Sequence, residues 1–222
     1  MARRRLGGFL KATAMSPYEA LELARILRPA IRDERVLAAI ASVPRERFVP
    51  KRERERAYAN VALPIGAGQT ISQPLVVARM LEILALKATD RVLDVGTGSG
   101  YHAALLSLLV DRVFTVERHP ELTERAERTL TDLGIDNVSF KVGDGWEGWP
   151  EESPFDAINV AAAMGEEPPH SLEEQLADQG RMVAPVGAKE QHLVLTERAG
   201  DRLRRRRLEA VQFVPLVRGT ER

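Results

Sequence analysis

Residues 92–101 read Val-Leu-Asp-Val-Gly-Thr-Gly-Ser-Gly-Tyr, and this stretch decides the fold. It begins as an apolar run typical of a buried strand, has glycine at every second position from Gly96 to Gly100, and leads into an apolar helical stretch over 103–110. Glycine lacks a Cβ atom, so the backbone can turn tightly and a ligand can approach peptide N–H groups. A helix starting straight after such a turn points unpaired N–H groups toward the same place. The stretch therefore predicts a nucleotide-type pocket at the carboxyl end of a strand, where open α/β sheets bind ligands.

The sequence after this turn alternates regularly between strand and helix patterns. We expect strands at 112–116, 137–142, 155–160 and 181–186, with helices at 120–133 and 171–177. Such alternation predicts an α/β fold with a doubly wound, mostly parallel, Rossmann-like sheet. Three further strands, at 192–196, 202–208 and 211–216, follow without intervening helices and predict an antiparallel C-terminal edge. The order of these last strands stays open.

The sequence before the turn predicts helices that precede the sheet. Apolar residues recur at helical spacing over 17–27, where Ser16 is a candidate N-cap, and Asp33 can cap a second helix that ends before Pro44. A third helix is expected over 75–86. We interpret residues 1–222 as one domain. It has an N-terminal helical extension and substrate-side loop (1–68), a cofactor-binding core (69–190) and C-terminal strands (191–222).

Composition narrows the class of protein. The chain has 222 residues, 32 basic and 32 acidic side chains, and no cysteine. Zero formal net charge disfavours nucleic acid or an anionic membrane as partner, and the lack of cysteine excludes disulfides and thiolate chemistry. The N-terminus, with Arg3-Arg4-Arg5, resembles the start of a twin-arginine signal, but Lys11 interrupts the apolar run, so a basic tail is favoured. No stretch reaches the roughly 20 apolar residues of a membrane span. We expect a cytoplasmic monomer without a metal site.

The glycine spacing indicates which nucleotide is bound. The dinucleotide fingerprint G-x-G-x-x-G needs a glycine where this chain has Tyr101, which disfavours a nicotinamide oxidoreductase. The loop also lacks the Lys-Ser/Thr pair of a P-loop. A G-x-G-x-G loop with an acid two residues before it resembles the S-adenosylmethionine site of class I methyltransferases. The candidate cofactor-binding residues are Asp94, Gly96, Thr97, Gly98, Ser99, Gly100, Glu117, Asp144 and Gly145.

Three acids in this set have alternative roles. Glu117 ends the next strand, where a carboxylate can accept both ribose hydroxyls, or it is a surface acid. Asp144, between Gly143 and Gly145, either accepts from an adenine amino group or belongs to a plain turn. Asp94 either faces the amino group of the cofactor or orients the glycine loop through backbone N–H groups.

A second informative segment lies upstream, at residues 69–74, which read Gln-Thr-Ile-Ser-Gln-Pro. Pro74 biases Gln73 away from helical angles, so Ser72 sits at or just before a helix N-terminus. Ser72 is then either a plain N-cap or part of an anion site made of its hydroxyl and helix N–H groups.

Together these segments resemble the protein-L-isoaspartate O-methyltransferase family over 43–217. The segment from Gly68 to Pro74 is particular to that family, whereas the glycine loop is shared by many methyltransferases. The other residues that carry the resemblance are 43–50, 63–66, 93–101, 142–145, 148–149, 153–156, 175–176, 185–187 with Gln191, and 213–216.

The resemblance implies transfer of a methyl group from S-adenosylmethionine to the α-carboxyl of L-isoaspartyl residues in damaged proteins and peptides. It implies that Ser72 is the active-site serine. Thr70, Ile71, Gln73 and Pro74 would form the same substrate pocket. A carboxylate with a pKa near 4 is already a nucleophile at neutral pH, so no general base is required. The two histidines His102 and His119 are therefore expected to be incidental.

Some residues depart from the family pattern, and other functions remain open. Asn60 stands where the family commonly has aspartate, Asp178-Gln179-Gly180 replaces a Gly-Gly turn, and Ala161-Ala162 stands where a threonine is common. Asn60 could alter substrate preference because it removes a charge near an anionic substrate. The alternatives are a same-fold methyltransferase acting on another carboxyl group or a small molecule, and a cofactor-binding protein without activity.

Overall fold

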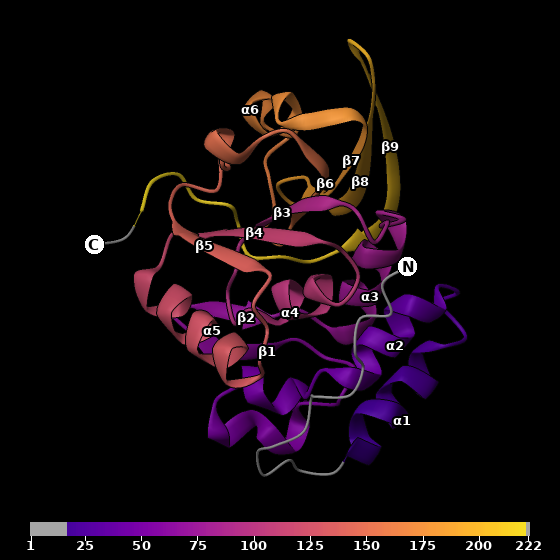
Figure 1. The fold of residues 1–222 in the computed structure, drawn as a ribbon, viewed down its shortest axis with the longest axis vertical. Coiled ribbons are helices and arrows are strands. Elements are labelled where there is room, and N and C mark those ends of the chain that lie inside the picture. The colour runs from indigo at the N-terminus through magenta and orange to yellow at the C-terminus, as the bar shows by residue number, and fades with distance from the viewer. Residues whose placement is uncertain (1–16, 221–222) are drawn as a thin grey trace.

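A seven-stranded sheet forms the centre of the molecule (Figure 1). The computed structural model describes residues 17–220, so the basic tail and the candidate cap Ser16 lie outside the described residues. Strand order in the sheet is β5-β4-β3-β6-β7-β8-β9. The first five strands in this order are parallel, and β8 and β9 are antiparallel to their neighbours. The expected fold class, a mostly parallel sheet with an antiparallel edge, is confirmed.

The parallel strands place three loops at one edge of the sheet. The five parallel strands are β3 (Arg91–Val95), β4 (Arg112–Glu117), β5 (Val138–Val142), β6 (Phe155–Val160) and β7 (Leu176–Val186). In the register, Val95 lies beside Val116 on one side and Val160 on the other. The loops that follow β3, β4 and β6 therefore meet at the carboxyl end of the sheet, where a crossover from one strand to the next leaves room for a ligand.

The C-terminal part differs from the sequence-based expectation. Strands β8 (Gln191–Ala199) and β9 (Arg202–Val211) form a long hairpin, but the strand expected at 211–216 is wrong. Beyond Val211 the chain is extended and its backbone makes a short bridge to Ala163. Ala163 N–H donates to Val214 O and Leu216 N–H donates to Ala163 O, both at 2.7 Å. Pro215 has no N–H to continue a ladder. The expected helix at 171–177 is also shorter, because α6 covers only His170–Glu174 and β7 starts at Leu176.

Short helices and a small hairpin precede the sheet. Helices α1 (Pro17–Leu27) and α2 (Glu34–Ser42) are followed by the 3-10 helices η1 (Arg45–Phe48) and η2 (Lys51–Arg56). The Asp33 side chain caps α2 by accepting from Arg35 N–H, as the sequence predicts. Strands β1 (Leu63–Gly66) and β2 (Gln69–Ile71) pair antiparallel and lead into α3 (Pro74–Ile83). Helices α4 (Tyr101–Ser107) and α5 (Pro120–Asp132) follow β3 and β4, and a 3-10 turn, η3 (Pro150–Glu152), precedes β6.

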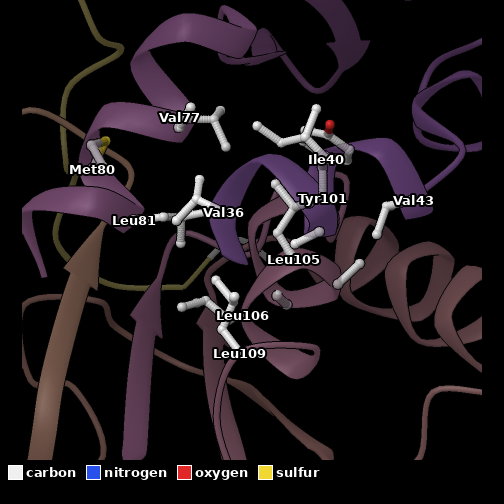
Figure 2. Close-up of a cluster of buried hydrophobic side chains, with 14 of the residues drawn as sticks. Val36, Ile40, Val43, Val77, Met80, Leu81, Tyr101, Leu105, Leu106 and Leu109 are labelled. Atoms are coloured by element: carbon white, nitrogen blue, oxygen red, sulfur yellow. The ribbon is translucent and has the colours of Figure 1, made fainter. Parts of the chain in front are cut away.

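The sheet separates two apolar cores. Helices α1–α5 lie on one side of it and α6 lies on the other (Figure 1). On the larger side α2, α3 and α4 interlock through Ile40, Val77, Met80 and Leu105, all at most 1% exposed (Figure 2). Burying each such side chain stabilises the fold by about 1.5–3 kcal/mol. This packing fixes the start of α3 beside the start of α4, so the segment before α3 and the glycine loop before α4 reach the same edge of the sheet.

Within residues 17–220, none of the helices combines the length and the apolar character that crossing a membrane would need.

Candidate active site

A cavity lies at the carboxyl ends of β3, β4 and β6, and residues from both predicted segments line it. The glycine loop forms one wall and residues 69–72 form another, with the C-terminal segment 214–217 across them. The lining residues named in the sequence-based prediction are Thr70, Ile71, Ser72, Gly96, Thr97, Gly98, Ser99, Glu117 and Gly145. Asp94, Gly100, Asp144, Gln73 and Pro74 do not line this cavity.

The glycine loop is held mostly by its own neighbours. The N–H groups of Gly96 and Thr97 donate to Val116 O at 2.9 and 3.3 Å, and Gly100 N–H donates to Thr97 O at 2.8 Å. Gly98 N–H donates to a carboxylate oxygen of Glu117 at 2.9 Å. Because these N–H groups are already used, the loop is not a cradle for phosphate, which agrees with the absence of a P-loop sequence.

Gly100 serves helix packing and does not contact the cavity. Its φ of +87° is left-handed, and a Cβ there would lie 2.9 Å from both Ala126 Cβ and Leu130 Cδ1 of α5. Only glycine allows α5 to approach the loop this closely. Any contribution of Gly100 to the cofactor site is therefore indirect, because Gly100 sets the position of the loop.

Glu117 is buried and faces the cavity at the end of β4. Oε2 accepts from Gly98 N–H, and Oε1 accepts from His119 N–H at 3.1 Å. Each carboxylate oxygen can accept more than one hydrogen bond, so Glu117 keeps free acceptor positions. Its burial excludes the interpretation as a surface acid.

Asp144 anchors the C-terminal segment. One oxygen accepts from Trp146 N–H at 2.8 Å and the other accepts from Gly219 N–H at 2.7 Å. The indole N–H of Trp146 donates to Leu216 O at 3.0 Å. Asp144 thus holds the segment that closes the cavity, a role that the sequence did not predict, and its adenine-binding role stays a prediction.

Asp94 lies behind the loop, fully buried, and it bonds to side chains instead of backbone N–H groups. It accepts from Asn159 Nδ2 at 2.8 Å and from Thr115 Oγ1 at 3.0 Å, and Thr115 also bonds to Thr97 Oγ1 at 2.7 Å. Burial raises the pKa of Asp94 to about 7, and the two hydrogen bonds oppose this shift. Asp94 therefore links β3, β4 and β6 and supports the loop through Thr97. Thr115 and Asn159 were missed; polar residues in the apolar runs 113–116 and 157–160 were the available signal.

Ser72 is not an N-cap. The N-cap of α3 is Gln73, which makes no side-chain cap bond, and Leu75 N–H instead donates to Asn60 Oδ1 at 3.0 Å. The plain-cap interpretation of Ser72 is therefore wrong. Within residues 17–220 its hydroxyl has no hydrogen-bond partner, so it is free to bind a ligand. Pro74 is buried in the first turn of α3, away from the cavity.

A second hollow adjoins the first at Ser72 and leads toward the surface. It is lined by the loop before β1, by β2 and the start of α3, by the residue after β6, and by the end of β9 with the chain that follows it. The residues are Ala62, Thr70, Ser72, Gln73, Val76, Ala161 and 210–214. Thr70, Ser72, Ala161 and Val214 line both spaces. The two hollows therefore adjoin, and Ser72 lies in the wall of both.

Comparison with known proteins decides the family. The family model "Protein-L-isoaspartate(D-aspartate) O-methyltransferase (PCMT)" matches residues 19–221. This chain belongs to that family.

Related proteins agree along most of the chain. Family members from Aeromonas salmonicida and Vibrio vulnificus are 54% and 55% identical to this family member over 197 and 189 residues. These matches cover 89% and 85% of the chain and 96% and 90% of the relatives. A structure from Plasmodium falciparum, described as a putative member in complex with S-adenosyl-L-homocysteine, aligns with a TM-score of 0.79 and 26% identity. It covers 89% of this chain and 98% of that one. Another structure, of a protein-L-isoaspartate O-methyltransferase, gives a TM-score of 0.80 at 30% identity over 87% of this chain, which spans 64% of that structure.

Two lining residues of this family member were not assigned a role from sequence. Tyr101 and His102 open α4 and lie beside Ser72 in the cavity wall. Burial, with a smaller contribution from Arg45, lowers the pKa of His102 to about 4, so its imidazole is neutral at pH 7. Its Nε2 and the Tyr101 hydroxyl are buried without hydrogen-bond partners among the described residues. Among those residues, no group of three or more His, Asp or Glu side chains is placed to hold a metal ion.

Proposed function

We propose that this chain moves the methyl group of S-adenosylmethionine to the α-carboxylate of L-isoaspartyl residues in damaged proteins and peptides. The family match over 19–221 supports this activity, as does the S-adenosyl-L-homocysteine named for the Plasmodium falciparum relative. One observation carries the proposal. Ser72 and the glycine loop line one cavity, and a second hollow adjoins that cavity at Thr70, Ser72, Ala161 and Val214.

The residues on the loop side fit a cationic nucleoside. Glu117 offers free acceptor positions toward the cavity at the place where ribose hydroxyls would bind. Gly145 lines the cavity without a Cβ, which would lie 2.8 Å from Val95 and 2.9 Å from Leu216. When bound, S-adenosylmethionine supplies a methyl group on a positively charged sulfur. No basic side chain is needed to hold it, and the loop offers none.

The residues on the other side act by placement. The substrate carboxylate is ionised at neutral pH, and the reaction needs one of its oxygens in line with the methyl carbon, with water partly removed. In our proposal the Ser72 hydroxyl donates to this carboxylate and fixes its direction. Val77 and Val214, which line the cavity next to Ser72, exclude water. His102 is neutral and takes no part as an acid or a base, because the reaction transfers no proton.

We propose that one chain suffices for activity as a single domain, in which, of the described residues, 17–68 belong to the substrate side, 69–190 form the cofactor-binding core and 191–220 include the segment that closes the cavity. The lack of cysteine and of long apolar stretches supports a cytoplasmic enzyme without membrane or nucleic-acid partners.

The test is methylation of a peptide with one L-isoaspartyl residue, beside its aspartyl twin, using labelled S-adenosylmethionine. We expect label on the isoaspartyl peptide alone, held as a methyl ester that base hydrolyses to labelled methanol. Label on neither peptide, with transfer to a small carboxylic acid, would favour the alternative of a same-fold O-methyltransferase. A melting temperature raised by S-adenosylhomocysteine, without transfer to any acceptor, would favour a binding protein.

A further inference from the structure

A buried cation lies directly behind the substrate side of the cavity. Arg45, at the start of η1, has no exposed surface. Its Nε donates to Ala57 O and its Nη2 donates to Ser72 O, both at 2.8 Å. Its guanidinium carbon lies 4.7 Å from the centre of the Tyr101 ring. Arg45 therefore connects the segment that carries Ser72 to the first residue of α4.

This cation has no carboxylate partner. Among residues 17–220, no acidic side chain forms an ion pair with Arg45, and the adjacent Glu46 accepts from the Tyr58 hydroxyl instead. Burial lowers the pKa of Arg45, and interaction with Tyr101 opposes this. Arginine nevertheless stays protonated in proteins. The nearby imidazole of His102 is neutral at pH 7 and does not balance the charge.

The hydrogen bonds of Arg45 are also incomplete. Its Nη1 is buried without a partner, and so is the neighbouring Tyr101 hydroxyl. A buried charge held only by neutral carbonyls and a ring is unfavourable by itself and is normally paired. The folded protein thus retains, next to Ser72, a positive charge that none of its described residues balances.

The same guanidinium acts on the peptide group at the site. Ser72 O, which accepts from Arg45, belongs to the peptide unit whose N–H is that of Gln73. A charged donor on a carbonyl polarises that unit and strengthens its N–H as a donor. Gln73 lines the second hollow beside Ser72. Arg45 can therefore favour an anion at this place without touching the cavity itself.

We propose that Arg45 is a positioning residue whose buried charge selects an anionic group at Ser72, the α-carboxylate of the isoaspartyl substrate. This inference rests on the proposed function for the identity of the anion. Arg45 supplies electrostatic attraction through the Ser72–Gln73 peptide unit, and Ser72 supplies the direct contact.

The test compares a charged ligand with its neutral twin. With S-adenosylhomocysteine present, titration calorimetry measures two peptides, one with an isoaspartyl α-carboxylate and one with the α-carboxamide at that position. We expect the wild type to prefer the carboxylate, and Arg45→Gln to reduce that preference about tenfold. Affinity for S-adenosylhomocysteine should change less than twofold. Arg47→Gln, which removes a partly exposed arginine paired with Asp132, is the matched control and should leave the preference unchanged.

A purely structural role for Arg45 would weaken both peptides equally and leave their ratio intact, and that result would overturn the proposal. If Arg45→Gln does not fold, Arg45→Lys keeps the charge and should retain the preference within about threefold; a folded Lys variant that loses it would contradict the proposal. Failure of the proposed function looks different. In that case the wild type would bind S-adenosylhomocysteine but neither peptide.

Discussion

The two sides of the cavity differ in how completely their polar groups are paired. On the cofactor side, the N–H groups of Gly96, Thr97, Gly98 and Gly100 have hydrogen-bond partners within the chain, and so do the carboxylates of Glu117 and Asp94. On the substrate side, the Ser72 hydroxyl lacks a partner among the described residues, as do Arg45 Nη1 and the Tyr101 hydroxyl. The cofactor side is thus held largely by hydrogen bonds within the chain. In our proposal the Ser72 hydroxyl donates to the isoaspartyl carboxylate, and the buried charge of Arg45 attracts that carboxylate without touching it.

The difference follows from local sequence. The glycine loop sits between two strands whose carboxyl ends carry acceptors, so its donors find partners nearby. The segment 69–74 runs from a three-residue strand into a helix that starts at Pro74, and the N-cap residue Gln73 makes no side-chain cap hydrogen bond. Pairing of polar groups stabilises a fold, and unpaired buried donors mark places where function opposes stability.

The largest expected effect concerns Asp94 on the cofactor side. Its pKa is raised to about 7 in the folded state, against about 3.9 in an unfolded chain. The folded state therefore binds this proton more tightly, and the free energy of unfolding falls as pH rises from about 4 to about 7. About 3 pKa units correspond to a loss of about 4 kcal/mol. Asp94→Asn should remove this component.

Urea unfolding of the wild type and Asp94→Asn between pH 4 and pH 8 measures it. The lowered pKa of His102 makes the free energy of unfolding rise between about pH 4 and pH 6.5 in both proteins. The difference between the two proteins therefore isolates the contribution of Asp94. Parallel stability curves for the two proteins would show that the supporting network does not depend on the Asp94 charge.

The next effect concerns Glu117. Glu117→Gln keeps the shape of the side chain, but an amide NH2 group replaces one carboxylate oxygen. The N–H group of either Gly98 or His119 then faces a donor instead of an acceptor. We expect a loss of about 3 kcal/mol in cofactor binding, or about 100-fold in the dissociation constant of S-adenosylhomocysteine by calorimetry. Glu121→Gln, an exposed acid in the first turn of α5, is the control. Unchanged cofactor affinity in Glu117→Gln would remove this residue from the site.

The smallest effect concerns Asn60. Its side-chain oxygen caps α3 at Leu75, so Asn60→Ala should lower the free energy of unfolding by about 1 kcal/mol. Asn60→Asp can accept the same hydrogen bond and should leave stability and the peptide KM nearly unchanged. A tenfold change in peptide KM for Asn60→Asp would mean that position 60 faces the substrate, as its departure from the family pattern first suggested.

Much of the fold could be predicted because the period of the apolar residues and the spacing of the glycines are local signals. The parallel strands and the turn at 96–100 follow from apolar runs and breakers within a few residues. The segment 211–216 has the apolar pattern of a strand, but beyond Val211 its backbone bridges to Ala163 and does not join a ladder of the sheet. Its role depends on a contact that sequence does not show.

The site was predictable in its residues more than in their roles. Ser72 and Glu117 line the cavity as expected, but Gly100 packs against α5 and Asp144 holds Gly219. Those contacts join residues far apart in the chain. Arg45 lies in the range 43–50 that carries the family resemblance, but its sequence position gives no sign that its side chain is fully buried.

The central claim is that the substrate side, through Ser72, performs a task separate from cofactor binding. The most direct measurement is the single-turnover methylation rate of an isoaspartyl peptide by Ser72→Ala, with S-adenosylhomocysteine affinity measured on the same preparation. Ser153→Ala, at a half-buried serine outside the cavity lining, is the matched control. We predict a rate reduced about 100-fold, as for loss of one aligned donor, with cofactor affinity within twofold of the wild type. A wild-type rate in Ser72→Ala, or an equal loss in rate and cofactor affinity, would contradict this account.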